Sequence, residues 1–249
     1  FFNKPITIDR LIELESITPE AAQFLEKLVK SKYNIFISGG TGSGKTTFLN
    51  VLSDYVPDDE RVITIEDSAE LQLHNINNIV RLEARVANSE GTNAVSIRDL
   101  IKASLRMRPD RIVVGEVRGP EAIDMLQAMN TGHDGSLSTG HANSPKDMLT
   151  RLETMVLMGM DMPVSAIRAQ ISSAIDIIVH LARLRDKSRK VVQIAEVGNC
   201  INGEIALTPL FKFVENSHDK NGKVIGTLVR QNNVFNRTQK LEAAGFSEW

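Results

Sequence analysis

A glycine-rich loop lies between a short apolar run and a helix-like stretch, and it limits the possible folds of this chain more than any other segment does. The loop spans residues 39–47, reads GGTGSGKTT and fits the pattern G-x-x-x-x-G-K-[ST]. An apolar run at Asn34–Ser38 precedes it, and Phe48, Leu49 and Leu52 mark one face of the stretch that follows. A strand that turns through glycines into a helix presents successive backbone N–H groups, which bind phosphate. The segment therefore predicts a phosphate-binding loop in an α/β fold.

Each residue type in the loop suits one part of a bound nucleotide. The ammonium group of Lys45 would neutralise charge on the β and γ phosphates, and the hydroxyl group of Thr46 would be a ligand of Mg²⁺. ATP and Mg²⁺ are therefore the expected cofactors. No further metal is expected, because none of the five histidines has metal-ligand spacing to a second strong ligand. The residues expected to bind the nucleotide are Gly39, Gly40, Thr41, Gly42, Ser43, Gly44, Lys45, Thr46 and Thr47.

The rest of the chain alternates short β-branched runs with amphipathic stretches as far as about Leu184, which is typical of an α/β domain with a mostly parallel sheet. The expected strands of that sheet are Asn34–Ser38, Val62–Ile65, Ile79–Leu82, Arg111–Gly115 and Gly135–Thr139. Hairpin signals follow, with expected strands at Ile175–Leu184, Val191–Val197, Glu204–Phe213 and Lys223–Val229. The pattern predicts helices flanking a parallel sheet, then an antiparallel, hairpin-rich extension.

These patterns suggest three parts along the chain. Residues 1–33 are expected to form a linker and a first helix, capped by Thr18. Residues 34–184 form the expected core, and residues 185–249 the antiparallel extension with a final short helix near Thr238–Ala244. Because the chain begins with Phe1 and has no signal-like start, it is interpreted as a piece of a longer cytosolic protein.

Composition excludes several classes of protein. With 29 Lys and Arg against 31 Asp and Glu the net charge is −2, so bulk attraction to nucleic acid is not expected. A hydrophobic content of 42% fits a soluble domain, and no apolar run approaches the roughly 18 residues of a membrane span. The single Cys200 excludes an internal disulfide framework.

Candidate catalytic groups follow three of the expected strands. Glu116 comes directly after Arg111–Gly115, at the sheet edge where ligands bind in open parallel sheets. Its carboxylate is the first choice for activating water and is also a candidate for holding Mg²⁺ through waters. Glu66 and Glu70 follow a second strand and are expected to assist. His141 follows a third strand and is expected to read the γ phosphate, although an isolated histidine more often has a structural role.

Two arginines are further candidates for a role on the γ phosphate. Arg81 and Arg85 lie in and beyond the expected strand Ile79–Leu82. A guanidinium group there would stabilise phosphate charge in its own subunit or in a neighbouring one. Ion pairing is the alternative, and both remain open; the candidate acids are Glu66, Asp67, Glu83 and Glu116. Arg118 is interpreted as structural.

Four segments together resemble one family. They are Gly39–Thr47, Val62–Leu71, Leu105–Gly119 and Gly132–Ser144. Their order and spacing are similar to those of the type II/type IV secretion ATPase superfamily, and look closest to its CpaF/TadA branch, the motors of tight-adherence (Flp-type) pilus assembly. The resemblance identifies the segments as Walker A, the aspartate box, a Walker B segment with Glu116, and the histidine box with His133 and His141.

This resemblance implies a RecA-like P-loop NTPase domain, hydrolysis of ATP with Mg²⁺, and hexameric rings. It also implies partners in an inner-membrane pilus or secretion platform, with no nucleic acid and no direct membrane insertion. The expected location is cytoplasmic and peripheral to the inner membrane through those partners. The family's N-terminal domain, which closes over the nucleotide and contributes arginine, is expected to be absent here. Turnover by this chain alone is therefore expected to be poor.

Two other functions stay open from the residues alone. A RecA-like nucleic-acid translocase would use the same phosphate loop, but the balanced charge and only two Tyr and one Trp for base stacking disfavour it. A nucleotide-gated assembly module would bind ATP and hardly hydrolyse it. A GTP switch is disfavoured because the chain has no Asn-Lys-x-Asp segment.

Overall fold

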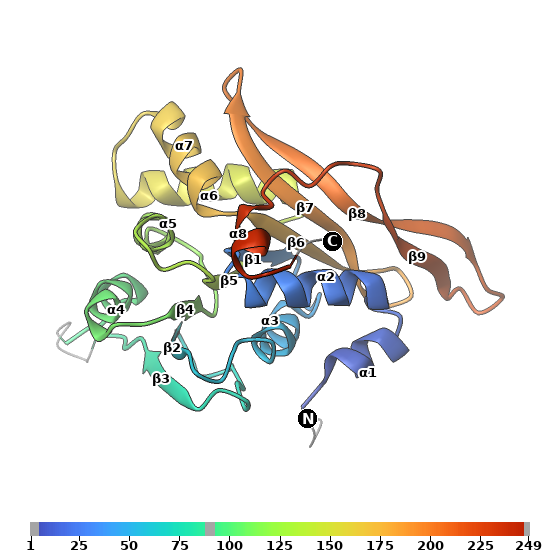
Figure 1. Cartoon of the computed structure of the whole chain (residues 1–249), viewed down its shortest axis with the longest axis horizontal. Helices are drawn as coiled ribbons and strands as arrows, with labels where there is room; N and C mark the ends of the chain where they lie inside the picture. The colour runs from blue at the N-terminus through green and yellow to red at the C-terminus, as the bar shows by residue number, and fades with distance from the viewer. Residues whose placement is uncertain (1–4, 88–92, 247–249) are drawn as a thin grey trace.

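The computed structural model describes residues 5–87 and 93–246, and nine strands in this part of the chain form one sheet (Figure 1). The strands are β1 (Ile35–Gly39), β2 (Arg61–Glu66), β3 (Asn78–Glu83), β4 (Arg111–Val114), β5 (Leu137–His141), β6 (Ile177–Arg183), β7 (Arg189–Ile201), β8 (Glu204–His218) and β9 (Val224–Arg230). The helices are α1 (Ile8–Glu13), α2 (Pro19–Lys30), α3 (Lys45–Ser53), α4 (Ile97–Ser104), α5 (Glu121–Asn130), α6 (Pro145–Gly159), α7 (Val164–Ala174) and α8 (Gln239–Ala243), with a 3₁₀ turn at Leu105–Met107.

The order of strands across the sheet is β3-β2-β4-β5-β1-β6-β7-β8-β9. Neighbours from β3 to β6 pair in parallel, and neighbours from β6 to β9 pair antiparallel. The predicted α/β class, a mostly parallel sheet with an antiparallel extension, is therefore confirmed. The predicted division near residue 184 stays a prediction, since pairing of β6 with β7 carries the sheet across it.

Two apolar cores hold the layers together, one on each face of the sheet. Ile35 and Ile37 of β1 belong to the core that includes α2 and α3, whereas Phe36 belongs to the core that includes α5, α6 and α7. Figure 1 shows the two groups of helices on opposite sides of the strands. Because side chains alternate between faces along a strand, a run that is apolar throughout must be covered on both sides.

Several element ends differ from the predicted ones. Strand β5 ends at His141, two residues beyond the predicted end, because Gly39 at the end of β1 pairs with His141. Strand β6 begins at Ile177 and not at Ile175, since α7 continues to Ala174. Strands β7 and β8 are longer than predicted, and α1 was not predicted. None of the helices in residues 5–87 and 93–246 is both long and apolar enough to cross a membrane.

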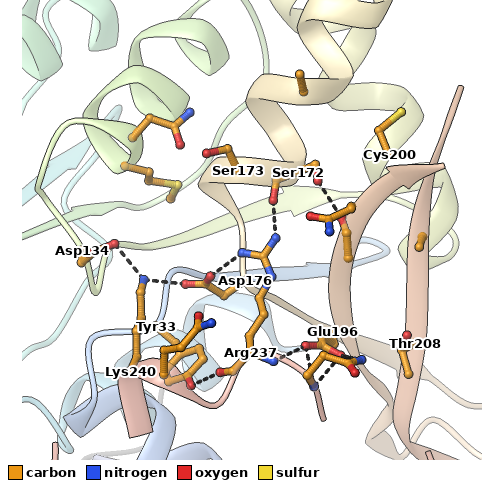
Figure 2. A pocket seen from close by; sticks show the side chains of 18 of the residues that line it. Tyr33, Asp134, Ser172, Ser173, Asp176, Glu196, Cys200, Thr208, Arg237 and Lys240 are labelled. Atoms are coloured by element: carbon orange, nitrogen blue, oxygen red, sulfur yellow. Dashed lines mark hydrogen bonds and ion pairs between the residues drawn. The ribbon is translucent and has the colours of Figure 1, made fainter. Parts of the chain in front are cut away.

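The C-terminal segment is bound to the start of the central strands. Arg237 and Lys240 point at Asp176 from two sides, as Figure 2 shows, with N–O distances of 2.7 and 2.8 Å. The hydroxyl group of Tyr33 donates to the carbonyl oxygen of Arg237, and Glu196 accepts the backbone N–H of the same residue. A cavity of about 990 Å³ lies beside these groups. These contacts are at the opposite end of β1 from the glycine-rich loop.

A buried ion pair joins the loop before β2 to the start of β4. The guanidinium group of Arg111 is completely buried and binds both carboxylate oxygens of Glu60, while Arg111 Nη1 donates to the carbonyl oxygen of Gly135. The ammonium group of Lys32 lies 3.7 Å from Glu60. Removing one member of such a pair leaves an uncompensated buried charge.

We expect Arg111→Met to lower the free energy of unfolding by about 3–5 kcal/mol, because it leaves the carboxylate of Glu60 buried without its main partner. Urea unfolding followed by circular dichroism measures this loss. Arg10→Met is the matched control, since Arg10 pairs with Glu13 at the surface and exposed pairs contribute little. Equal decreases in the free energy of unfolding in the two variants would show that the buried pair stabilises the fold no more than the exposed pair does.

Candidate nucleotide site

The glycine-rich loop has the backbone shape that its sequence predicts. Gly44 caps α3 with φ +97°, in the left-handed region that favours glycine. A Cβ atom on Gly39 would lie 2.5 Å from the carbonyl oxygen of Leu181 and 2.5 Å from Ser43 Oγ, so only glycine fits there. The first turn of α3 thereby opens onto the loop, and its free N–H groups and helix dipole favour an anion.

Lys45 lies folded over the mouth of the loop. Its ammonium group donates to the carbonyl oxygen of Gly40 at 3.1 Å and lies 3.3 Å from His141 Nδ1. The residue is buried, and burial lowers the pKa of Lys45 from its ordinary value, with Arg118 also lowering it and Glu116 opposing the shift. A cation held in a partly dry pocket without a full carboxylate partner suits the binding of phosphate oxygens.

Glu116 and His141 meet at the ends of β4 and β5. His141 Nε2 lies 2.8 Å from Glu116 Oε1. Burial lowers the pKa of His141, the charges of Lys45 and Arg118 add to this, and Glu116 acts in the opposite sense. The neutral ring is therefore favoured near pH 7, with Nδ1 accepting from Lys45 and Nε2 lying close to Glu116. The ammonium group of Lys45, the imidazole ring of His141 and the carboxylate of Glu116 thus lie in contact one after another.

Backbone contacts between strand ends hold these side chains together. The hydroxyl group of Thr139 donates to the carbonyl oxygen of Gly115 at 2.6 Å, and the N–H of Val117 donates to the carbonyl oxygen of Thr139 at 2.9 Å. The N–H of Ala142 reaches the carbonyl oxygen of Gly39 at 3.4 Å. The segments that follow β4, β5 and β1 are thus tied to one another.

Arg118, which was interpreted from the sequence as structural, contacts Glu116 directly. Its Nη2 atom donates to Glu116 Oε2 at 2.5 Å, and its Nη1 atom lies 3.6 Å from Asp67. The hydrogen bond and the charge of Glu116 raise the pKa of Arg118. Glu121 accepts the backbone N–H groups of Arg118 and Gly119 and so orders this loop. The i, i+2 spacing from Glu116 was the available signal, because it places both side chains on one side of an extended segment.

Glu66 and Glu70 have different surroundings from Glu116. Glu66 is buried, and its Oε1 atom accepts the backbone N–H groups of Glu70 and Leu71 at 2.9 and 2.8 Å. Burial raises the pKa of Glu66, while these two hydrogen bonds oppose the shift. Its carboxylate therefore orders the turn after β2, next to Gly115. The side chain of Glu70 is exposed at the edge of the site.

Arg81 and Arg85 lie far along the sheet from the glycine-rich loop. Both arise from β3 or its continuation, and β2, β4 and β5 separate β3 from β1. Arg81 donates to the carbonyl oxygen of Leu73, and Arg85 donates to that of Asn93. Within residues 5–87 and 93–246 neither makes an ion pair with the four acids considered for it.

The donors present fit a nucleotide with Mg²⁺. A cleft of about 490 Å³ opens beside the loop, between Gly40 and Thr41 on one wall and His141, Asn143 and Arg151 on the other. Thr46 is half-buried in the first turn of α3. The described residues contain no cluster of three or more His, Cys, Asp or Glu side chains that would hold a metal ion alone. An Mg²⁺ ion here would therefore be held by Thr46, by the phosphates and by water, with Glu116 beyond the waters.

The other histidines lie in different settings. His180 of β6 is buried, with its Nδ1 atom 2.7 Å from the hydroxyl oxygen of Ser38, the residue before the glycine-rich loop. Burial lowers the pKa of His180, and a hydrogen bond with the backbone of Asn143 opposes this. The carbonyl oxygen of His133 accepts from Ser136, so this histidine borders the turn before β5.

Comparison with known proteins decides the family. The sequence profile described as "Type II/IV secretion system protein" matches residues 2–237. The chain belongs to this family. A putative conjugal transfer protein of Mycobacterium tuberculosis is 42% identical over 195 residues, which are 77% of this chain and 54% of that protein. The type IV secretion system protein PtlH of Bordetella pertussis is 43% identical over 176 residues, or 69% and 52% of the two chains.

Solved structures agree with this assignment. The VirB11 ATPase of the Brucella suis type IV secretion system superposes with a TM-score of 0.65 at 33% identity, over 76% of this chain and 56% of that one. The pilus retraction motor PilT superposes with a TM-score of 0.53 at 24% identity, over 89% and 53%, and supports the fold alone. The fold of this secretion-family chain is RecA-like, as predicted; the CpaF/TadA branch stays a prediction. The chain spans about half the length of the curated relatives it matches.

The burial of His180 makes the stability of this family member depend on pH. Because its pKa is lowered in the folded state, the unfolded chain binds the proton more readily. The contribution of the neutral ring is fully present above the ordinary pKa of 6.5 and is lost as the pH falls through the lowered folded value. We therefore expect His180→Gln to flatten the fall in unfolding free energy between about pH 7.5 and 5.5.

Urea unfolding at the two pH values measures this slope. His218→Gln is the matched control, because His218 is exposed on β8 and should leave the slope unchanged. A slope in His180→Gln as steep as that of the unsubstituted chain would contradict the expectation.

Proposed function

We propose that this chain is the motor domain of an Mg²⁺-dependent ATPase that drives protein secretion or pilus assembly. The observation that carries the proposal is the contact chain from Lys45 through His141 to Glu116 at the mouth of the glycine-rich loop. It brings a cation for phosphate, an imidazole and a carboxylate to one edge of the sheet. An assembly module that only holds nucleotide has no need of a carboxylate poised beside the terminal phosphate.

In the proposed reaction Glu116 accepts a proton from a water molecule as the water oxygen attacks the γ phosphorus. The bond from that phosphorus to the β–γ bridging oxygen breaks, and the products are ADP and phosphate. Lys45 and the loop N–H groups stabilise the charge that moves to the leaving oxygen, and Mg²⁺ would neutralise the phosphate oxygens. Glu66 assists by ordering the segment next to Glu116, and Glu70 takes part through the backbone N–H that it donates to Glu66.

His141 is suited to report the γ phosphate. The ring lies between Lys45 and Glu116 and contacts both. A γ phosphate that draws the ammonium of Lys45 toward itself removes one of these contacts and frees the imidazole to turn. Arg118 would keep Glu116 in place during this change, because it holds the other carboxylate oxygen.

The working assembly is proposed to be a ring of six copies. The position of Arg81 and Arg85 on the edge strand supports this, because they reach a phosphate only on a neighbouring subunit. The described relatives belong to conjugal transfer and type IV secretion systems. By analogy the ring would act in the cytoplasm and bind inner-membrane platform proteins, without nucleic acid and without entering the membrane. A CpaF/TadA-like role in pilus assembly is one form of this proposal.

We expect Glu116→Gln to retain ATP and to lower the turnover number by about a hundredfold or more, because it removes the group that accepts the proton. Lys45→Ala should instead weaken nucleotide binding itself. Steady-state phosphate release and equilibrium binding of a fluorescent ATP analogue measure the two effects. Glu204→Gln is the matched control, because Glu204 is exposed and, within the part of the chain that the structure describes, forms an ion pair with Lys146 alone. Undiminished turnover in Glu116→Gln would show that another acid accepts the proton from water. If neither the unsubstituted chain nor its variants hydrolyse ATP, the assembly module is favoured.

We also expect turnover per subunit to rise with protein concentration, because a site completed by a neighbour works only in the assembled ring. Phosphate release measured across a dilution series, beside light scattering for mass, tests this. Arg81→Ala and Arg85→Ala should lower the turnover of the assembled protein without lowering the affinity of isolated subunits for ADP. If the rate of phosphate release per subunit stays constant when the protein is diluted to the monomer, the role proposed for a neighbouring subunit is wrong.

A further inference from the structure

The hairpin between β6 and β7 lies against the outer side of the glycine-rich loop. Strand β1 pairs with β5 on one side and with β6 on the other, so Gly39 is opposite both His141 and Leu181. The catalytic side chains described above arise from the β5 side. The β6 side carries Arg183 and Arg189, which face each other across the hairpin in register. The loop is thus flanked by charged groups on two sides, and the catalytic residues proposed above occupy only the β5 side.

Distances place both arginines beside the glycines of the loop. Arg189 Nε donates to the carbonyl oxygen of Gly42 at 2.8 Å. A Cβ atom on Gly44 would lie 3.3 Å from Arg189 Cδ, and one on Gly42 would lie 4.0 Å from Arg183 Nη1. Side chains at these two loop positions would therefore meet the arginines. Both guanidinium groups border the segment whose N–H groups are expected to bind phosphate.

The charge of this pair is not neutralised by the chain. Both side chains are exposed, and no carboxylate among residues 5–87 and 93–246 forms an ion pair with either. Arg183 has no hydrogen-bond acceptor in the same residues, and Arg189 uses Nε alone. The next arginine of the hairpin behaves differently, since Arg185 forms two hydrogen bonds with the carboxylate of Glu215. Unpaired guanidinium groups beside a phosphate loop favour an anionic ligand.

The hairpin is held firmly enough to act as a wall. Asp186 accepts from the N–H and hydroxyl groups of Ser188 and from the N–H of Val224 on β9. The hydroxyl group of Ser16 donates to the carbonyl oxygen of Arg189 at 2.7 Å, and Lys190 is buried against the turn after α1. Ordering of this kind reduces the entropy lost when a ligand binds.

We propose that Arg183 and Arg189 form the second wall of the nucleotide site and bind the phosphates that ATP and ADP share. The γ phosphate belongs on the β5 side, where Lys45, His141 and Glu116 meet. A nucleotide that runs across the loop leaves it on the β6 side, with its α and β phosphates facing the arginine pair. The pair therefore retains ADP after phosphate leaves. This inference rests on the proposed function, because it needs a nucleotide in the loop.

The test compares four single variants of the chain in equilibrium binding of ADP by titration calorimetry. Arg183→Ala and Arg189→Ala should each raise the dissociation constant for ADP about tenfold, since each removes a charged donor to phosphate. Arg189→Lys should recover part of the affinity. Arg185→Ala is the matched control on the same hairpin and should bind ADP as the unsubstituted chain does. Urea midpoints for all variants show whether the hairpin still folds.

The dependence on salt gives a second measurement. Affinity for ADP should fall less steeply with ionic strength in Arg183→Ala than in Arg185→Ala, because one cation fewer contacts phosphate. Dissociation constants for ADP that match Arg185→Ala in both arginine variants would overturn the inference and leave the proposed function intact. If the unsubstituted chain binds ADP no better than Lys45→Ala does, the proposed function fails as well.

Discussion

The parallel pairing of β1 with both β5 and β6 is the constraint on which the rest of the site depends. It fixes Gly39 between His141 and Leu181, so the chain that leaves β1 can only turn outward between two neighbouring loops. The carbonyl oxygen of Leu181 leaves no room for a Cβ atom at Gly39. The close approach that demands glycine is thus the same contact that sets the hairpin of β6 and β7 beside the phosphate loop.

The charged groups at this edge leave Lys45 without a carboxylate in direct contact among the described residues. Glu116 contacts His141 on one oxygen and Arg118 on the other, and Lys45 has a backbone carbonyl and an imidazole in place of a carboxylate. Burial therefore lowers the pKa values of both Lys45 and His141. A phosphate group beside Lys45 supplies the negative charge that this buried ammonium group lacks, so the cost of burying the cation is offset when the anion binds.

Sequence patterns were enough for features that are local in the chain. The glycine-rich loop carries its own geometry, and the uniform apolar texture of residues 112–114 predicts a strand covered on both faces. The placement of Glu116 after a strand follows from the same reasoning. His141 could be put near the sheet edge, but its exact neighbours depend on β5 ending at His141, which the pairing with Gly39 decides.

What sequence reasoning missed depends on strand order and register. Arg118 stands near Asp67 only because β2 and β4 are neighbours, and nothing in either segment encodes this. Nothing in the sequence of the hairpin distinguishes Arg183 and Arg189. They lie beside the glycine-rich loop because β6 is the neighbour of β1. The same order carries Arg81 and Arg85 to the far edge of the sheet, with β2, β4 and β5 between them and β1. Strand order thus decides which arginines lie beside the loop and which lie at the outer edge, and it is set by contacts between segments that are far apart in the sequence.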